Sequence, residues 1–343
     1  MTANKPSESI ELVLASPRGF CAGVDRAITI VEKALQIYGS PIYVQHEIVH
    51  NKHVVQRLRE SGAIFVENIN EIPLGSRAIY SAHGVSPAVR KIAERRKLKI
   101  LDATCPLVTK VHGEAQRYAQ KDYTIILIGH HKHVEVQGTV GEAPEQILVV
   151  GNLEEVDNLV VPDENKVGYI TQTTLSLDDT VEIISALKKR FPKIQGPAKN
   201  DICYATQNRQ NAVKALSKEV DLVLVVGAPN SSNSVRLLEV ARATGVKARR
   251  IESEEELNPE WFKGIRSIGV TAGASAPEDI LQGVVSGLKK MFSSSNVRDL
   301  NIVQENVTFA LPAFVKKCLN FFAATPRGEI RSFSCEDISP KVL

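Results

Sequence analysis

Residues 203–227 read CYATQNRQNAVKALSKEVDLVLVVG: a cysteine, then apolar residues at helical spacing, then an apolar strand that ends at a glycine. The same order follows Cys21, where AGVDRAITIVEKAL precedes PIYVQ, and Cys105, where PLVTKVHGEAQRYA precedes TIILIG. In each copy the strand ends 24 residues after the cysteine, at Gln45, Gly129 and Gly227. Because such self-similarity indicates a repeated structural unit, the sequence predicts three copies of a cysteine loop, a helix and a strand.

Each copy then continues through two more strands. A strand end precedes an acidic helix start in FVENINEI (65–72), VVGNLEEV (149–156) and RIESEEEL (250–257). A further strand and a turn of small residues lead into another helix in AIYSAHGVSP (78–87), VGYITQTTLS (167–176) and SIGVTAGASAP (267–277). Strands that alternate with helices predict parallel sheets of βαβ units, with ligand sites at the carboxyl ends of the strands.

The repeat therefore predicts an α/β fold of three lobes with mainly parallel sheets, related by an approximate three-fold axis. The length of 343 residues alone would suggest two domains, at about 150 residues each. The strand and cysteine loop at 11–21 are expected to complete the sheet of the third lobe, which closes a ring and brings the three cysteine loops to one centre. The expected boundaries are lobe 1 at 22–104, lobe 2 at 106–202, lobe 3 at 204–290 and a C-terminal extension at 291–343.

The composition is that of an ordinary globular protein. The chain has 43% hydrophobic residues, and 42 basic against 39 acidic residues give a net charge of +3. This balance excludes disorder for most of the chain and predicts no nucleic-acid surface. No apolar run is long enough for a membrane helix, and the start MTANKPSESI has no signal-peptide pattern, so we expect a cytoplasmic protein without a membrane partner.

The five cysteines do not form a disulfide framework, because their number is odd and no CxxC pair occurs. Thiolates of Cys21, Cys105 and Cys203 that meet at an axis would bind a soft metal centre, either zinc or an iron–sulfur cluster. Three protein ligands leave one position open, as in a catalytic centre. The alternative is that they are small buried residues. Cys318 and Cys335 lie outside the repeat and are interpreted as incidental.

Polar residues gather in the other loops that follow the repeated strands. Histidines, hydroxyls, an amide and helix N-termini are the groups that bind a phosphate, so an anion site is expected beside the metal. The alternative is helix capping: Ser275 with Glu278 as a capping box, Ser86 before Pro87, and Ser232 or Asn233 at another helix start. The residues with this pattern are His50, His83, His133, Thr173, Thr174, Ser231, Ser232, Asn233 and Ser275.

Glu135, in the loop HHKHVEV, is the candidate proton donor, with a pKa set by burial and by the nearby histidines. The alternative is a carboxylate that only complements a helix dipole. A second pattern is rejected: His46 and His50 match HExxH, but they directly follow a predicted strand and do not share a helix face.

The chain closely resembles the 4-hydroxy-3-methylbut-2-enyl diphosphate reductase (IspH/LytB) family. The resemblance rests on PRGFCAGVDRAI, EIVHN, SAHGVSP, DATCPLVTKVH, TQTTLS, DICYATQNRQ, NSSNS and TAGASAPEDI, which span residues 17 to about 280 in order. It implies three lobes around a central 4Fe–4S cluster, one per chain, held by Cys21, Cys105 and Cys203, with one iron not ligated by cysteine. It also implies the last step of the methylerythritol phosphate route: reductive dehydroxylation of the substrate to isopentenyl and dimethylallyl diphosphates.

The resemblance also implies roles for the polar residues. Glu135 delivers the proton and Thr173 contacts the hydroxyl end of the substrate. Ferredoxin or flavodoxin is the implied electron donor. Ser232 and Thr174 are neighbours with less defined roles, and the diphosphate is held by His50, His83, His133, Ser231, Asn233 and Ser275.

Two departures and two competing functions stay open at this point. Val134 stands where the family usually has proline, and the chain beyond about residue 311 looks longer than usual. The competing functions are an iron–sulfur dehydratase resembling quinolinate synthase, and a non-enzymatic protein, either a cluster-bearing redox sensor or a structural zinc protein.

Overall fold

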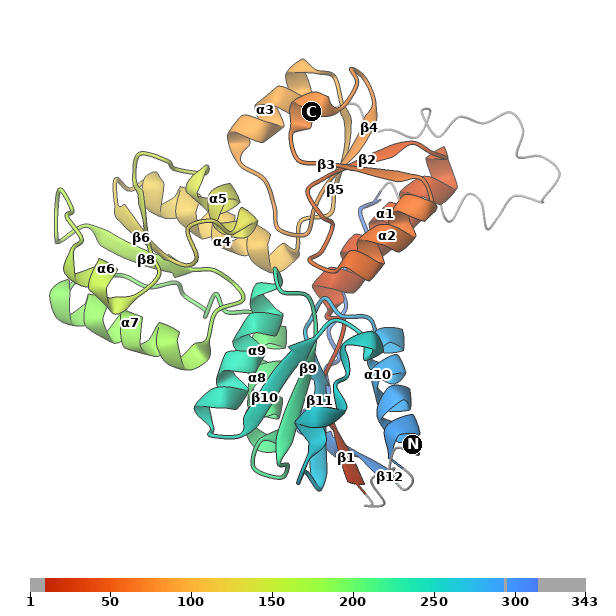
Figure 1. The fold of residues 1–343 in the computed structure, drawn as a ribbon. Coiled ribbons are helices and arrows are strands. Elements are labelled where there is room, and N and C mark those ends of the chain that lie inside the picture. Colours follow the sequence, from red (N-terminus) through yellow and green to blue (C-terminus); the bar gives the residue numbers. More distant parts are fainter. Residues whose placement is uncertain (1–9, 293–294, 314–343) are drawn as a thin grey trace. The chain divides into compact units, whose positions relative to one another are not determined.

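The computed structural model describes residues 10–292 and 295–313 (Figure 1). The interpretation of Cys318 and Cys335 therefore lies outside the described residues. The chain divides into two compact units. One comprises the described residues of Met1–Cys21, His50–Lys52 and Lys110–Asn306, and the other those of Ala22–Val49, His53–Thr109 and Val307–Leu343.

The first unit contains a five-stranded parallel sheet of order β10-β9-β11-β1-β12. The strand β1 pairs with β11 in the register Glu11 to Ser267 and with β12 in the register Ile10 to Ser295. The strand β1 thus lies between β11 and β12, in a sheet built otherwise from residues 222–301. The bounds are β1 Ile10–Ser16, β9 Leu222–Val226, β10 Lys247–Ile251, β11 Ser267–Ala272 and β12 Ser295–Asn301.

Helices cover both faces of this sheet, because successive residues of each buried strand point to opposite sides. In β1, Leu12 and Leu14 belong to the core formed with α10, whereas Val13 and Ala15 belong to the core formed with α8 and α9. Figure 1 shows α8 and α9 on one side of the sheet and α10 on the other. The bounds are α8 Tyr204–Leu216, α9 Ser232–Ala243 and α10 Glu278–Met291, with short 3-10 turns η2 Glu254–Glu256 and η3 Pro259–Phe262.

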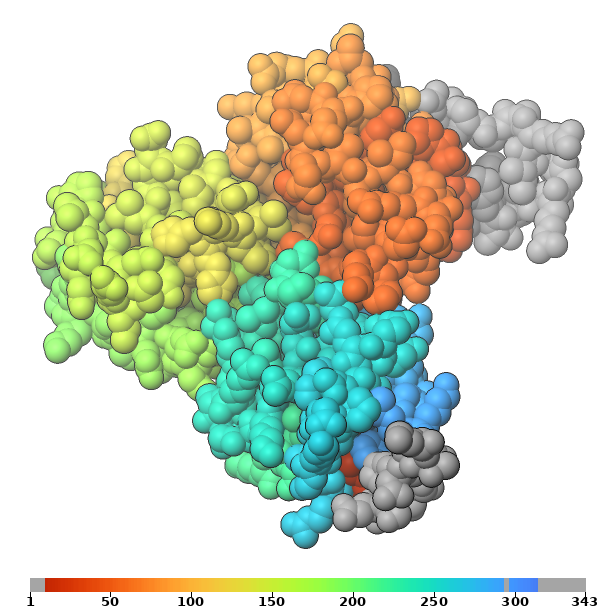
Figure 2. All heavy atoms as spheres, in the orientation of Figure 1, coloured from red at the N-terminus to blue at the C-terminus, as the bar shows by residue number. Residues whose placement is uncertain are grey.

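The same unit contains a three-stranded parallel sheet of order β7-β6-β8. One face packs against α6 and α7 through Val156, Ile183 and Leu187, and the other against α4 and α5. Figure 2 shows all atoms in the orientation of Figure 1, with the segment that contains this sheet coloured from yellow to green. The bounds are β6 Thr124–Ile128, β7 Ile147–Val150, β8 Val167–Thr171, α4 Pro106–Ala119, α5 Val134–Val140, α6 Leu153–Asp157 and α7 Leu177–Arg190.

The second unit contains a four-stranded parallel sheet of order β3-β2-β4-β5. Its strand β2 contacts α1, and Ala78 and Tyr80 of β4 share a core with Val89 and Ile92 of α3. The bounds are β2 Ile42–Gln45, β3 Ala63–Val66, β4 Arg77–Tyr80, β5 Lys99–Asp102, α1 Ala22–Tyr38, α2 Lys52–Glu60, η1 Ile69–Glu71 and α3 Pro87–Arg95.

Three parallel sheets with covering helices confirm the predicted α/β class. The structure contains one element that the sequence did not predict: residues 295–301, within the expected C-terminal extension, form the edge strand β12. Its sequence SNVRDLN has few apolar residues, so no strand pattern is visible before the backbone pairing with β1 is known. Within the described residues, no helix has the length and apolar character needed to cross a membrane.

Candidate active site

The three repeat cysteines occupy equivalent places in the backbone. The N–H of Cys203 donates to the carbonyl of Thr173 at 3.0 Å, that of Cys21 to Ala274 at 3.3 Å and that of Cys105 to Ala82 at 2.9 Å. The three acceptors are Ala82, Thr173 and Ala274, each two residues beyond the end of its strand, β4, β8 or β11. One backbone hydrogen bond therefore holds each cysteine at the carboxyl end of a parallel sheet.

Cys203 is the N-cap residue of α8. Its Sγ accepts a hydrogen bond from the Thr206 N–H at 3.3 Å and lies 3.1 Å from Thr206 Oγ1. Cys203 as a whole is partly buried, and its thiol is the buried part. Burial raises the pKa of Cys203 to about 11, and the nearby thiolate of Cys21 adds to this shift. The two sulfurs are thus close enough to interact electrostatically.

Cys21 ends a tight loop that follows β1. The N–H of Gly19 donates to the Ala272 carbonyl at 3.2 Å, next to the bond that Cys21 makes. Gly19 has φ +66°, and a Cβ there would lie 3.2 Å from the Ala276 carbonyl oxygen. Since L side chains rarely adopt this backbone conformation, the glycine of PRGFC is required by the loop itself.

Cys105 lies in the second unit, at the start of α4. Arg26 donates to the carbonyl of Thr104 at 3.1 Å and interacts electrostatically with Cys105. Burial lowers the pKa of Arg26, while the negative charges of Asp102 and, more weakly, Cys105 act to raise it. None of the three cysteines is in a disulfide. In residues 10–292 and 295–313, no group of three or more His, Cys, Asp or Glu side chains has the arrangement of a single-ion metal site.

Glu135 has a buried carboxyl that is hydrogen-bonded to Thr173. The side chain of Thr173 donates to Oε2 at 2.9 Å and its backbone N–H donates to Oε1 at 2.7 Å. Burial raises the pKa of Glu135, while Thr173 and, more weakly, His112 and His50 oppose the shift. Because desolvation favours the neutral form, this carboxyl can hold a proton next to the backbone that fixes Cys203.

His133 and His50 lie edge to face, with ring centroids 5.4 Å apart. His133 is the N-cap of α5 and its Nδ1 accepts from the Glu135 N–H at 3.2 Å, which leaves the proton of the neutral ring on Nε2. Burial, then His50 and His130, lower the pKa of His133 to about 3. Nδ2 of Asn230 lies 3.5 Å from His50 Nδ1. His133 therefore offers a neutral imidazole donor at neutral pH.

The start of α9 adds the hydroxyls and the amide. Ser231 Oγ caps the helix and lies 3.2 Å from Ser275 Oγ, which donates to the His50 carbonyl at 3.1 Å. Asn233 Nδ2 donates to Thr206 Oγ1 at 3.4 Å, and its Oδ1 accepts from the Ala274 N–H at 2.9 Å. Asn233 thus connects the residues that hold Cys203 and Cys21.

Ser232 and Thr174 form a second hydroxyl pair, with Thr174 Oγ1 donating to Ser232 Oγ at 3.0 Å. His83, in the second unit, has Nδ1 3.2 Å from Ser81 Oγ, next to the Ala82 that holds Cys105. The structure therefore gathers His50, His133, Glu135, Thr173, Thr174, Ser231, Ser232, Asn233 and Ser275 in the unit of Cys21 and Cys203, and His83 in that of Cys105.

The capping alternatives are partly wrong. Ser86 does cap α3, with its Oγ 3.4 Å from the Val89 N–H. Ser275 forms no capping box, because α10 begins after Pro277 without any side-chain cap, and neither Ser232 nor Asn233 is the N-cap of α9, since Ser231 is. The rejection of HExxH is confirmed, because residues 46–50 contain no helix.

Sequence reasoning missed two residues of this site. Thr206 bonds Cys203 and Asn233, and its position three residues after a capping residue was the available signal. Gln172 donates to Thr174 at 3.0 Å and accepts from the His130 N–H at 3.0 Å, for which no local pattern exists.

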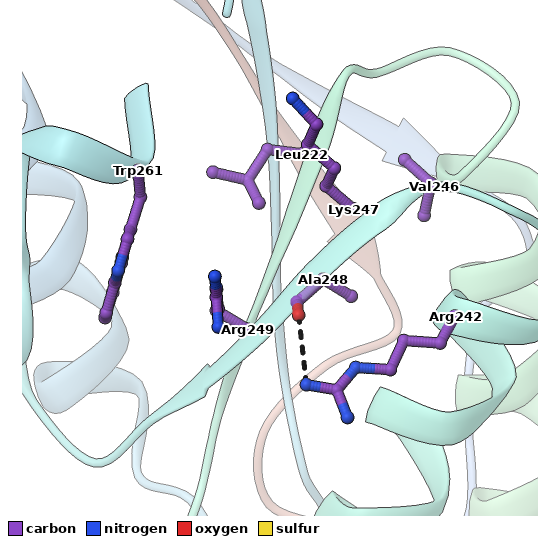
Figure 3. A pocket seen from close by; sticks show the side chains of 7 residues that line it. All are labelled: Leu222, Arg242, Val246, Lys247, Ala248, Arg249 and Trp261. Atoms are coloured by element: carbon purple, nitrogen blue, oxygen red, sulfur yellow. Dashed lines mark hydrogen bonds between the residues drawn. The ribbon is translucent and has the colours of Figure 1, made fainter. Parts of the chain in front are cut away.

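A surface pocket of about 350 Å³ lies elsewhere, at the amino ends of β9 and β10 (Figure 3). Arg249 stacks 5.6 Å from the ring centre of Trp261, and Arg242 donates to the Ala248 carbonyl at 3.4 Å. Ligands of parallel sheets bind at the opposite, carboxyl ends of the strands. This pocket contains none of the predicted site residues and is not the active site.

Comparison with known proteins links this arrangement to one family. The family model described as LytB protein matches residues 12–289. Proteins named 4-hydroxy-3-methylbut-2-enyl diphosphate reductase are 54% identical over 302 residues in Ralstonia nicotianae (88% of this chain, 93% of that one) and 55% over 306 residues in Mannheimia succiniciproducens (88% and 97%). The solved structure of E-1-hydroxy-2-methyl-but-2-enyl-4-diphosphate reductase from Plasmodium falciparum has TM-score 0.87 and 42% identity, covering 93% of this chain and 99% of that one.

Proposed function

The chain belongs to the LytB protein family, and we propose that it reduces (E)-4-hydroxy-3-methylbut-2-enyl diphosphate to isopentenyl and dimethylallyl diphosphates. Two electrons and two protons replace the carbon–oxygen bond of the allylic alcohol by a carbon–hydrogen bond, and the hydroxyl leaves as water. The observation that carries the proposal is the buried Glu135 carboxyl, held by the same Thr173 whose carbonyl fixes Cys203.

We propose that Cys21, Cys105 and Cys203 hold a 4Fe–4S cluster. The donor set fits this group, because three thiols outside any disulfide occupy equivalent backbone positions at the carboxyl ends of three sheets. With a pKa of about 11, free Cys203 is a neutral thiol at neutral pH, so binding iron must release its proton. When bound, the cluster supplies electrons and, at the iron without cysteine, a Lewis acid for the substrate hydroxyl.

Glu135 supplies the proton that leaves with the hydroxyl. A leaving hydroxide is converted to water when a neutral acid lies within hydrogen-bonding reach, and burial keeps this carboxyl protonated to higher pH than an exposed glutamate. Thr173 fixes the carboxyl through two bonds, and its hydroxyl lies beside the proton to be transferred. We assign Thr173 to the hydroxyl end of the substrate for this reason.

The diphosphate is assigned to the group at the start of α9 and its neighbours. The 12-residue helix places N–H donors and the positive end of its dipole here, and His133 can donate through Nε2. These contacts orient the substrate without taking part in bond cleavage. The proposed binding residues are His50, His83, His133, Thr174, Ser231, Ser232, Asn233 and Ser275.

We further propose that the electron donor is a reduced ferredoxin or flavodoxin and that the enzyme works in the cytoplasm. Thiols that must stay reduced to bind iron require a reducing compartment.

The test is an anaerobic assay of the iron-reconstituted full chain with a reduced one-electron donor and the hydroxylated diphosphate. Formation of both five-carbon diphosphates, with broad absorption of the protein near 400 nm, supports the proposal. A colourless protein with stoichiometric zinc, or a reconstituted cluster that yields no product, would overturn it.

A further inference from the structure

Arg209 is the largest of the fully buried side chains, with 0% exposure among the described residues. It lies in the middle of α8, six residues after Cys203. A guanidinium is almost never fully buried unless it is paired and hydrogen-bonded. Its partners therefore indicate why this helix carries a charge in its core.

Three of its hydrogen bonds reach the Cys21 loop, and a fourth reaches the first turn of α8. Nε and Nη2 donate to the carbonyl of Gly19 at 3.1 and 2.7 Å, and Nη2 also donates to that of Phe20 at 3.2 Å. Nη1 donates to the carbonyl of Ala205 at 3.1 Å. One rigid group thus holds the two peptide carbonyls before Cys21 and one just after Cys203.

Glu305 provides the counter-charge. Its carboxylate accepts from Arg209 Nη1 at 3.1 and 3.3 Å and from Asn208 Nδ2 at 3.0 Å. Glu305 lies in the segment after β12, which the N–H of Ile302 attaches to the Ser16 carbonyl at 2.9 Å. The segment that follows β12 therefore supplies the carboxylate that pairs with Arg209 beside the Cys21 loop.

The Cys21 loop depends on the hydrogen bonds that Arg209 donates to its carbonyls, because the N–H groups of the loop are held only by long bonds. The N–H groups of Gly19 and Cys21 make long bonds of 3.2 and 3.3 Å, to the last residue of β11 and to the turn after it. Arg209 satisfies the carbonyls between them, so both sides of this short backbone stretch are fixed. Without it, the buried carbonyl of Gly19 and the partly buried carbonyl of Phe20 would lose these donors, and the loop would gain freedom to move.

We propose that Arg209, neutralised by Glu305, is a positioning residue that sets the spacing of the Cys21 and Cys203 sulfurs for the cluster. The inference rests on the proposed function for the identity of the metal group. The hydrogen bonds of Arg209 to the Cys21 loop are made by this chain's own residues and do not depend on that function.

The test uses full-length variants Arg209→Met, Arg209→Lys and Glu305→Gln. The matched control is Arg190→Met, because Arg190 donates to the carbonyls of Val156, Asp157 and Leu159 at the end of α6, away from any cysteine. Two quantities are measured: release of iron from the anaerobically reconstituted protein to a chelator, and hydrogen exchange of the Gly19–Cys21 amides in the metal-free protein.

Arg209→Met is expected to accelerate both processes by about tenfold or more, from the loss of charged hydrogen bonds. Arg209→Lys keeps the charge but lacks the planar guanidinium that bridges the carbonyls, so it should accelerate iron release and loop exchange less than Arg209→Met does. Glu305→Gln removes the counter-charge and should also give a smaller acceleration. Arg190→Met should lower the melting temperature while leaving iron release and loop exchange at wild-type values. A changed absorption spectrum of the cluster in the Arg209 variants would give further support, because a general loss of stability does not change the spectrum of the bound cluster.

Wild-type iron release and loop exchange in both Arg209 variants would overturn the inference, as would an equal acceleration in Arg190→Met. If Arg209→Met does not fold, Arg209→Lys and Glu305→Gln decide. If the wild-type chain binds no iron at all, the proposed function fails, whereas amide exchange of the loop still decides the positioning role.

Discussion

The loops of Cys203 and Cys105 have the same backbone and different side chains. In each, the cysteine N–H bonds the carbonyl two residues beyond a closing strand. Around Thr173 the side chains present a buried carboxyl, whereas around Ala82 they present His83 and a nearby arginine, Arg26. The repeat thus fixes where each cysteine lies, while the residues beside it determine the local chemistry.

The shared backbone arrangement predicts that Cys203 and Cys105 are equally required for iron binding and turnover. Cys203→Ser and Cys105→Ser should each lower iron content and reduce turnover to background, because hydroxyl oxygen is a poor ligand for this cluster type. Iron per chain after anaerobic reconstitution and product formation measure the effect. A Cys105→Ser protein with wild-type iron and turnover would show that the two loops are not equivalent.

The Glu135 carboxyl is expected to affect turnover but not cluster binding. Glu135→Gln should keep iron and absorption at wild-type values but lower kcat by about 10²- to 10⁴-fold, since the amide cannot donate an acidic proton. Single-turnover product formation with a pre-reduced protein measures the step. Unchanged kcat would place the proton source elsewhere.

The histidines predict an effect on substrate binding, from His133 beside Glu135 and from His83 beside Ala82. His133→Ala and His83→Ala should each raise KM by about tenfold or more while changing kcat little, because a hydrogen bond to a charged diphosphate is lost. Steady-state kinetics separate the two constants. A fall of kcat without a change in KM for His83→Ala would remove it from the diphosphate site.

The smallest expected effect is that of Thr173→Val, which removes the hydroxyl and keeps the backbone N–H. Turnover should fall by about tenfold. Thr173 lowers the pKa of Glu135 against the opposing effect of burial, so the variant should have a higher pKa there. Because the protonated carboxyl is the active form, the alkaline limb of the pH–rate profile should move to higher pH. A limb that stays in place would show that Glu135 does not control it.

Much of the fold follows from local patterns. The periodic apolar residues after each cysteine define the helices and strands, and their equal spacing predicts parallel sheets. The strand β12 was not predictable in this way, because SNVRDLN has the polarity of a loop and becomes a strand only through pairing with β1. The same applies to Ser275, whose neighbours suggest a capping box although its hydroxyl bonds the His50 carbonyl.

By itself the sequence determined the repeat, the set of three cysteines and the candidate carboxyl, because each depends on residue type at short, regular spacing. Only the tertiary structure showed that Thr173 holds Glu135 and that Arg209 bonds Gly19, which lies 190 residues away in the chain. Such contacts depend on how packed elements bring distant backbone groups together. A buried guanidinium has no sequence signature until its carbonyl and carboxylate partners are in place.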